Sequence, residues 1–513
     1  MRRLFLFAIG GTGARVVRSL TMMLASGIDG LHSKTEIVPI IIDYDLSNGD
    51  KTRAVNALKQ YSDIHAKLYP NTNEQYADHF FMTKLTPLKQ AGVANPEDLK
   101  DYEFNFGPAG TTLKFSDYLG LSQMDTFPNE RLTQDLMYAL YDGSPSDTKD
   151  AELELQMTKG FKGNPNIGSV VFHDLRETKE FLEFEGIFDA SRDKVFIVSS
   201  IFGGTGASGF PEIVNAIRSS HLATLRPATI GAALVLPYFN LQQFDPAKGD
   251  TGAIDAASFN AKTRAALSFY ATNNGINSKV NAMYYIGDEN HDAYEYNEGE
   301  GRQKNDAHVV EFVAATAIID FIQEQRQTEI ANAYNAYEFS IKDAKTEGTI
   351  QLTDFEDSIH EDVLDNLSSF AIAMKYYRDV VCGDRKKLNS STAFYGRFDL
   401  GNKLNKGIYR QIDEFLDTIT PKNDWGFYAW LDELQNHGHK LYPYCMDKAK
   451  GMRYVLTYKT IPEPTIGRKP IADATLSEKL NSKSQSVQTG SGSEQMFFKI
   501  LRDVAKETYN NVK

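Results

Sequence analysis

Cysteine is almost absent from this sequence, and no part of it is apolar over a long distance. The 513 residues include two cysteines, Cys382 and Cys445, and no CxxC pair, which argues against a disulfide scaffold and a thiolate zinc site. No apolar run reaches the roughly 20 residues that a bilayer-spanning helix needs. The opening MRRLFLFAIGG has too short an apolar stretch for a signal peptide. We therefore expect a first strand there, no membrane span and a cytoplasmic location.

An excess of basic residues is also lacking. The chain has 55 Lys and Arg against 68 Asp and Glu, a formal net charge of −13. An acidic chain repels phosphate backbones, so we expect no direct nucleic-acid binding. The hydrophobic fraction of 42% and the charged fraction of 24% are typical of globular proteins. At roughly 150 residues per domain, the length corresponds to about three domains.

The first half of the sequence alternates between strand-like and helical patterns. Short apolar runs of strand length occur at residues 2–9, 36–42, 194–200, 230–236 and 281–286. A glycine turn and a helical pattern over residues 14–24 separate the first two runs. This βαβ order predicts an α/β fold with a mainly parallel sheet of about six strands.

The domain organisation follows from what surrounds these strands. We expect a nucleotide-binding domain over residues 1–325, with a helical and loop insert at about 50–190. Residues 307–323 are apolar nearly all round, which predicts a buried central helix. Residues 326–478 are expected to form a smaller, atypical C-terminal domain with a strand at 452–458. In residues 479–513 we expect a flexible Gly/Ser-rich loop and a terminal helix.

Two glycine loops carry the chemical argument. Gly10-Gly11-Thr12-Gly13 follows the first strand, and Gly203-Gly204-Thr205-Gly206 follows the strand at 194–200. Backbone N–H groups at a helix N-terminus bind phosphate, and glycine lets the ligand approach closely. The first loop alone fits a tight turn without a ligand equally well. Two such loops in one parallel sheet would meet at neighbouring strand ends, which suggests a polyphosphate ligand.

Two common nucleotide-binding motifs fit less well. Neither loop ends in GK[ST], which disfavours a P-loop nucleoside triphosphatase. A dinucleotide-binding Rossmann domain remains an alternative, with Asp43 or Asp45 as the acidic residue after the second strand. That alternative leaves the second glycine loop unexplained.

The segment VFIVSSIFGGTGASGFPEIVNAIR resembles the signature strand, phosphate loop and helix of the tubulin/FtsZ superfamily, in a divergent bacterial branch. Phe202 replaces the first glycine of the usual run, and Ala207-Ser208 replace a later pair. LFLFAIGGTGARVVRSL is similar to the opening strand, loop and helix of that family. Gly107 to Thr111 is the counterpart of the loop that senses the γ-phosphate, and residues 233–240 resemble the segment near the ribose.

This resemblance implies a set of nucleotide-binding residues. They are Gly10, Gly11, Thr12, Gly13, Asp43, Asp45, Gly107, Ala109, Gly110, Thr111, Gly203, Gly204, Thr205, Gly206, Ser208, Pro237, Asn305, His308 and Glu311. In the family the start of the central helix holds guanine, and a carboxylate such as Glu311 can accept both hydrogens of its N1–H and N2–H edge. The alternative is that His308 and Glu311 form a satisfied polar pair on a buried helix.

The segment Leu352-Thr353-Asp354-Phe355-Glu356-Asp357 resembles the catalytic loop of the same family. The pattern there is Asn-x-Asp-Phe-x-Asp, and the loop reaches into the nucleotide pocket of the next subunit. Asp354 and Asp357, with Glu356 in reserve, are the candidate catalytic residues, because acids and a magnesium ion can position and polarise the attacking water. Helix N-capping explains the same acids equally well.

The resemblance therefore implies a GTPase that binds GTP or GDP with Mg²⁺ and assembles head-to-tail with copies of itself. An unidentified regulatory protein is a further expected partner. Two alternatives stay open at this point: a GTP-binding sensor that does not polymerise, and a structural scaffold without nucleotide.

Overall fold

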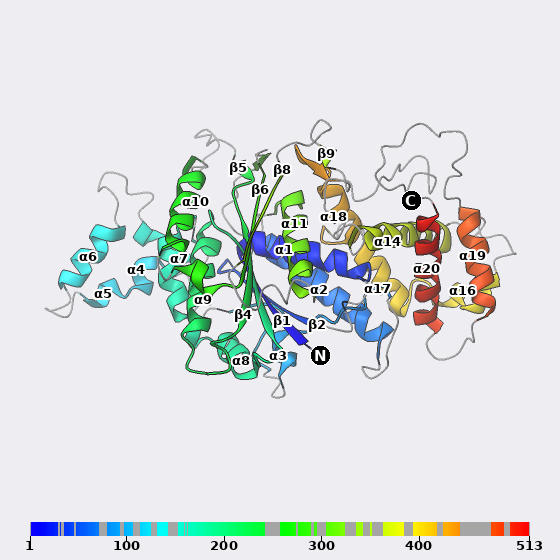
Figure 1. Ribbon diagram of the computed structural model, residues 1–513, viewed down its shortest axis with the longest axis horizontal. Helices are drawn as coiled ribbons and strands as arrows, with labels where there is room; N and C mark the ends of the chain where they lie inside the picture. Colours follow the sequence, from blue (N-terminus) through cyan, green and yellow to red (C-terminus); the bar gives the residue numbers. More distant parts are fainter. Residues whose placement is uncertain are drawn as a thin grey trace.

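The computed structural model describes most of the chain (Figure 1). The described residues are 2–28, 31, 35–45, 48–70, 79–92, 97–105, 113–124, 131–141, 152–157, 160–161, 163–241, 257–272, 275–288, 292–294, 304–323, 335–341, 349–350, 363–383, 393–417, 424–441, 473–486 and 493–511.

Six strands form one sheet in the order β2-β1-β3-β4-β6-β8, and every neighbouring pair is parallel. The strands are β1 (Arg2–Ile9), β2 (Thr35–Ile42), β3 (Lys194–Ser200), β4 (Thr229–Val235), β6 (Ala282–Asp288) and β8 (Asn335–Ile341). The central strands β1, β3 and β4 each carry a nearly continuous apolar run, because helices cover both faces of the sheet. The predicted α/β class with a mainly parallel sheet is confirmed.

Alternate residues of β1 point into two separate cores. Leu4, Leu6 and Ala8 pack with the helices α1 (Gly10–Ala25), α2 (Gly49–Leu68) and α11 (Val309–Ile322). Phe5 and Phe7 face the other layer. That layer contains α7 (Pro165–Phe172), α8 (Lys179–Ile187), α9 (Gly204–Arg218) and α10 (Ala257–Tyr270). Figure 1 shows the sheet edge-on between these two layers.

The helix α11 is the buried central helix that the sequence predicted. Of its 14 residues, all but Asp320 are buried, including Glu311. Its apolar side chains contact α1 on one side and the sheet on the other, so it has no face left for solvent.

A cluster of helices follows α11 and packs against the α1–α2 layer (Figure 1). It comprises α14 (Asp365–Tyr376) with a π-helical turn over Tyr377–Val381, α15 (Ala393–Arg397), α16 (Leu400–Lys403), α17 (Gly407–Leu416), α18 (Phe427–Glu433), α19 (Asp473–Gln485) and α20 (Ser493–Asn510). The apolar face of α20 covers α14, and α17 contacts α2.

Short elements complete the described chain. They are α3 (Leu88–Ala91), α4 (Phe115–Tyr118), α5 (Leu121–Met124), α6 (Arg131–Tyr141), the 3-10 turns Glu152–Glu154, His173–Glu177 and Ile276–Lys279, and the parallel pairs β5 (Phe239–Leu241) with β7 (Asp292–Tyr294) and β9 (Thr349–Ile350) with β10 (Lys440–Leu441).

Two boundaries differ from the sequence prediction. The sequence predicts a helix after the second glycine loop, but α9 already begins at Gly204, so that loop forms the first turn of the helix and Pro211 lies inside it. Proline there costs one helical hydrogen bond, to the carbonyl of Ala207, without ending the helix. The flexible loop is expected at 482–493, yet residues 482–485 belong to α19. The strand predicted at 452–458 lies outside the described residues.

Candidate functional site

The first glycine loop is a tight passage from β1 into α1. Gly10 has a φ of +70°, which glycine adopts without steric cost. A β-carbon on Gly13 would stand 2.6 Å from the carbonyl carbon of Ala8, so only glycine fits there. The residue before the helix is Ile9, whose side chain caps none of its first N–H groups. Those N–H groups therefore face the carboxyl edge of the sheet without a cap from the residue that precedes the helix.

The second loop repeats this arrangement at the end of β3. Gly203 precedes α9, and no side chain among the described residues caps that helix either. A β-carbon on Gly206 would lie 2.4 Å from the carbonyl oxygen of Ser200. Ser208 is buried, and its hydroxyl donates to the carbonyl of Gly204 at 2.7 Å. Its hydroxyl thus bonds within the helix.

The two loops lie side by side. A β-carbon on Gly10 would stand 3.6 Å from Cβ of Thr205 and 3.8 Å from the amide nitrogen of Gly206. This closeness follows from the sheet, since β1 and β3 are paired neighbours whose carboxyl ends point the same way. Two helix N-termini without a side-chain cap on the preceding residue consequently lie side by side at the carboxyl edge of the sheet.

A third segment, to which the sequence assigned no role, packs against the second loop. A β-carbon on Gly204 would stand 3.0 Å from Cβ of Phe161 and 3.2 Å from Cα of Gly163. Lys262 of α10 donates to the carbonyl of Gly163 at 2.7 Å, and Asn164 caps the following helix α7. A run rich in glycine that ends in Asn-Pro before a helix was the signal that could have found it.

Acidic and basic side chains follow β2 at the same edge. Asp43 accepts from the backbone N–H of Asp45 and from Nδ2 of Asn48 at 2.8 Å. The pKa of Asp43 is raised to about 7: burial is the main cause and the charges of Asp45 and Asp50 contribute, while Lys51 and the backbone N–H of Asp45 oppose the shift. Lys51 is itself buried and donates to the carbonyl of Asp45 at 2.8 Å.

Asp45 and Asn48 connect this acidic loop to the glycine segments. A β-carbon on Gly160 would stand 3.7 Å from Cβ of Asp45, and one on Gly11 would stand 3.5 Å from Nδ2 of Asn48. The carboxylate oxygens of Asp43 and Asp45 are of the kind that Mg²⁺ prefers. Among the described residues, no three His, Cys, Asp or Glu side chains form a group that could hold a metal ion by themselves.

Arg15, on α1, is the centre of a buried charge cluster beside the first loop. Its Nε donates to Glu311, its Nη1 to Asp50 at 2.5 Å and its Nη2 to the hydroxyl of Tyr238 at 2.7 Å. Burial opposes the charge of the guanidinium, but Glu311, Tyr238 and Asp50 outweigh that effect and raise the pKa of Arg15. Nη1 lies 3.5 Å from the position that a β-carbon of Gly11 would take.

The start of α11 is engaged with the rest of the protein. His308 and Glu311 form a capping box: the carboxylate accepts from the N–H of His308, and Nδ1 of His308 accepts from the N–H of Val310. Glu311 also accepts from the hydroxyl of Tyr238 at 2.6 Å. The backbone of Asn305 donates to Asp50 and accepts from Arg53. A purine contact by Glu311 would therefore replace one of these partners.

The C-terminal helices reach this end of the site. Glu433 of α18 accepts from the backbone N–H of Ala307 at 2.9 Å and from Arg18 and Arg53. His437 contacts the carbonyl of Ala307 at 2.9 Å. The segment that precedes α11 is thus held between the N-terminal layer and α18.

The structure therefore brings most of the predicted residues into two neighbouring groups. The glycine loops and the acidic loop after β2 lie together at the carboxyl edge of the sheet, and Asn305, His308 and Glu311 stand close to Arg15. Pro237 is half-buried and directly precedes Tyr238. Gly107, Ala109, Gly110 and Thr111, and the candidate catalytic residues Asp354, Glu356 and Asp357, lie outside the described residues.

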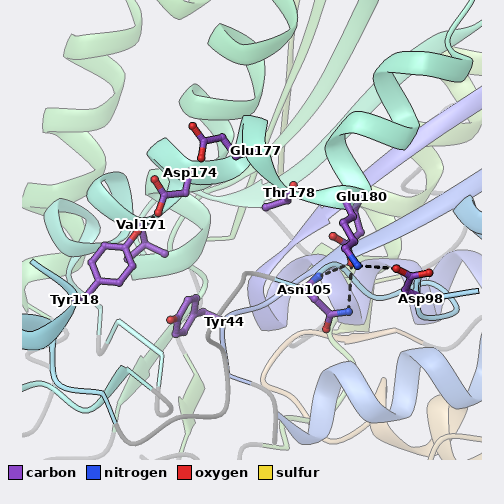
Figure 2. A pocket seen from close by; sticks show the side chains of 10 residues that line it. Tyr44, Asp98, Asn105, Tyr118, Val171, Asp174, Glu177, Thr178 and Glu180 are labelled. Atoms are coloured by element: carbon purple, nitrogen blue, oxygen red, sulfur yellow. Dashed lines mark hydrogen bonds and ion pairs between the residues drawn. The ribbon is translucent and has the colours of Figure 1, made fainter. Parts of the chain in front are cut away.

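A cavity of about 500 Å³ is lined by Tyr44 of the acidic loop and by more distant segments. Figure 2 shows its lining, with Tyr44 at one wall, Tyr118 beside Asp174, and Asn105 beside Glu180. Among the described residues that line it, Asp98, Asp174, Glu177 and Glu180 outnumber the cation Lys179. A negative lining of this kind repels anions.

Comparison with protein-family models and with curated proteins gives no match. Among solved structures the chain is similar to CetZ from Methanosaeta thermophila strain DSM 6194, with a TM-score of 0.27 and 14% sequence identity. The matched part is 56% of this chain and 46% of the CetZ chain, so this chain spans less than half the length of that protein. None of the helices that the structure describes has the length and apolar character needed to cross a bilayer.

Proposed function

We propose that the two glycine loops together bind the phosphate chain of a guanosine nucleotide, in a tubulin/FtsZ-like protein. One observation carries the proposal: Gly10 and Thr205 lie beside each other at the ends of adjacent strands, where a β-carbon on Gly10 would stand 3.6 Å from Cβ of Thr205. The uncapped N-termini of α1 and α9 then direct free N–H groups and the positive ends of two helix dipoles at one anion.

The choice of guanosine and of the reaction rests on the sequence resemblance. GTP hydrolysis with Mg²⁺, catalysed by Asp354 and Asp357 of a neighbouring copy, is the activity proposed, with head-to-tail assembly as its consequence. A heterologous contact that does not close produces filaments, and a nucleotide at that contact makes assembly depend on its γ-phosphate. Asp43 and Asp45 offer oxygen ligands that would suit the magnesium ion of a bound nucleotide.

Binding is tested first, by analysing the nucleotide released from the heat-denatured protein and by calorimetry with GTP. Gly11→Val should abolish binding, because its two methyl groups would crowd the first glycine loop and the polar side chains beside it, although its β-carbon alone makes only ordinary contacts of about 3.5 Å. Gly186→Ala, in α8, has open space around its β-carbon and should bind like the parent. No GTP binding by the parent would overturn the proposal.

Hydrolysis and assembly are tested next, by phosphate release and light scattering with GTP. Asp354→Ala and Asp357→Ala should bind GTP normally and hydrolyse it slowly. If both variants hydrolyse GTP as fast as the parent, these acids are not catalytic. Filaments that disappear as GTP is consumed support the assembly.

A second candidate function is a GTP-binding sensor that does not polymerise. It is favoured by the contacts of Glu433 and His437 with Ala307, which connect the C-terminal helices directly to the base end of the proposed site. GTP binding without any rise in light scattering would select the sensor. If the protein binds no nucleotide, the remaining candidate function is that of a structural scaffold.

A further inference from the structure

We infer that Arg15 makes recognition of the base depend on the phosphates: a phosphate at the first glycine loop draws Arg15 away from Glu311 and so frees Glu311 for a guanine. This inference rests on the proposed function. It states that the phosphate end of the proposed site must be occupied before the base end can bind guanine.

The position of Arg15 places its charge within reach of both ends of the site. Arg15 lies four residues after Gly11, on the same face of α1, where side chains one turn apart are neighbours. Its Nη1 lies 3.5 Å from the position that a β-carbon of Gly11 would take, and its Nε bonds to Glu311. One guanidinium therefore lies beside the first glycine loop and contacts the carboxylate at the start of α11.

Arg15 can exchange Glu311 for a phosphate because both side chains would keep other hydrogen-bond partners. Glu311 keeps the N–H of His308 and the hydroxyl of Tyr238 as donors when Arg15 leaves. Arg15 keeps Asp50, and a phosphate replaces the lost carboxylate with a bidentate acceptor. A buried ionised carboxylate that loses its cation needs new donors, which guanine N1–H and N2–H supply.

Without phosphate, the same pair blocks the base. Glu311 is fully buried and bonded to three donors, one of them Arg15. Guanosine alone carries no charge with which to compete for a guanidinium, so we expect it to bind weakly to the parent. Pyrophosphate would occupy only the glycine loops of the proposed site, and its presence should strengthen the binding of guanosine.

The test measures this coupling directly, by calorimetric titration of guanosine with and without saturating pyrophosphate on the full chain. In the parent, pyrophosphate should raise the affinity for guanosine by about tenfold or more, the worth of one charge-assisted hydrogen bond. In Arg15→Lys a single ammonium cannot bridge Asp50 and Glu311, so the coupling should fall below about twofold. Glu311→Gln, close to isosteric, should lose the coupling and bind pyrophosphate more tightly than the parent, because no carboxylate at that position then competes with the phosphate for Arg15.

The matched control is Arg18→Lys on the same helix. Arg18 is equally buried, but it bonds to Glu433 and to the carbonyls of Asp424 and Trp425. Arg18→Lys should lose stability like Arg15→Lys but keep the full coupling between pyrophosphate and guanosine. The comparison therefore distinguishes the general cost of removing a buried arginine from the loss of the partner exchange at Arg15.

Each remaining outcome is decisive. Coupling of equal size in the parent and in Arg15→Lys overturns the inference, as does a parent that binds GTP yet shows no coupling. A parent that binds neither GTP nor pyrophosphate overturns the proposed function and this inference with it.

Discussion

Asp43 carries a carboxyl group whose ionisation is suppressed in the folded chain. Its ordinary pKa of 3.8 rises to about 7 because burial removes it from water and Asp45 and Asp50 add like charge. Between about pH 4 and pH 7 the folded chain holds a proton that the unfolded chain has lost. The contribution of Asp43 to the free energy of unfolding therefore falls as pH rises through that range, and its loss is complete above pH 7.

Asp43→Asn should remove this pH dependence, because the amide cannot ionise. The difference in unfolding free energy, variant minus parent, should grow by roughly 2–3 kcal/mol between about pH 5 and pH 8, since about two pKa units of the shift lie in that range. Urea titrations at the two pH values measure it, and taking the difference cancels every other titrating group. A difference that is constant with pH would show that Asp43 is ionised throughout.

Gly206 must be glycine for a steric reason, apart from any role in binding the proposed ligand. Its missing β-carbon would overlap the carbonyl oxygen of Ser200 at 2.4 Å, backbone that cannot give way cheaply. Gly206→Ala should lower the free energy of unfolding by about 1–3 kcal/mol, the usual cost of overpacking. Gly186→Ala, with open space on a helix, should instead raise it by about 0.5–1 kcal/mol. Equal effects of the two alanines, measured by denaturant unfolding, would refute the steric argument.

At the scale of elements, one carboxylate joins α18 to the N-terminal layer. Glu433 bonds to Arg18 of α1, Arg53 of α2 and the N–H of Ala307. Glu433→Gln should cost about 3–5 kcal/mol, because two buried guanidinium groups lose their shared counter-ion. Asp424→Asn removes the exposed ion pair with Lys304 and should cost under about 1 kcal/mol. Thermal unfolding compares the two, and similar losses would mean that α18 is held by Trp430 and its apolar neighbours instead.

The elements of the sheet could be predicted because each depends on local sequence. The apolar runs at 2–9 and 194–200 become β1 and β3 with the expected bounds, since a strand covered on both faces is apolar throughout. The start of α9 could not be predicted in this way. Its glycines favour a loop when considered alone, yet they form helix where the neighbouring strands β3 and β1 fix their position.

The candidate site was predictable only in its glycine loops, where the pattern is contiguous. Arg15 meets Glu311 across 296 positions of sequence, and Gly204 meets Phe161 across 43. Such contacts are created by the sheet order and leave no local pattern. For Glu311 the sequence left two possibilities open, a contact with guanine and a polar pair with His308. The structure shows the pair, as a cap of α11, together with a bond to Arg15 that the sequence did not predict.

At the scale of the whole molecule, the net charge of −13 acts on any assembly of identical copies. Like charges on neighbouring copies repel over a Debye length of about 10 Å at 0.1 M salt and about 3 Å at 1 M. If the chain assembles head-to-tail with GTP, its critical concentration should fall as NaCl rises from about 0.05 to 0.5 M at saturating nucleotide. Sedimentation measures the polymer, with sucrose at matched osmolality as the control for excluded volume. A critical concentration that rises with salt would mean that opposite charges meet across the contact, so that local complementarity outweighs the repulsion between the acidic molecules.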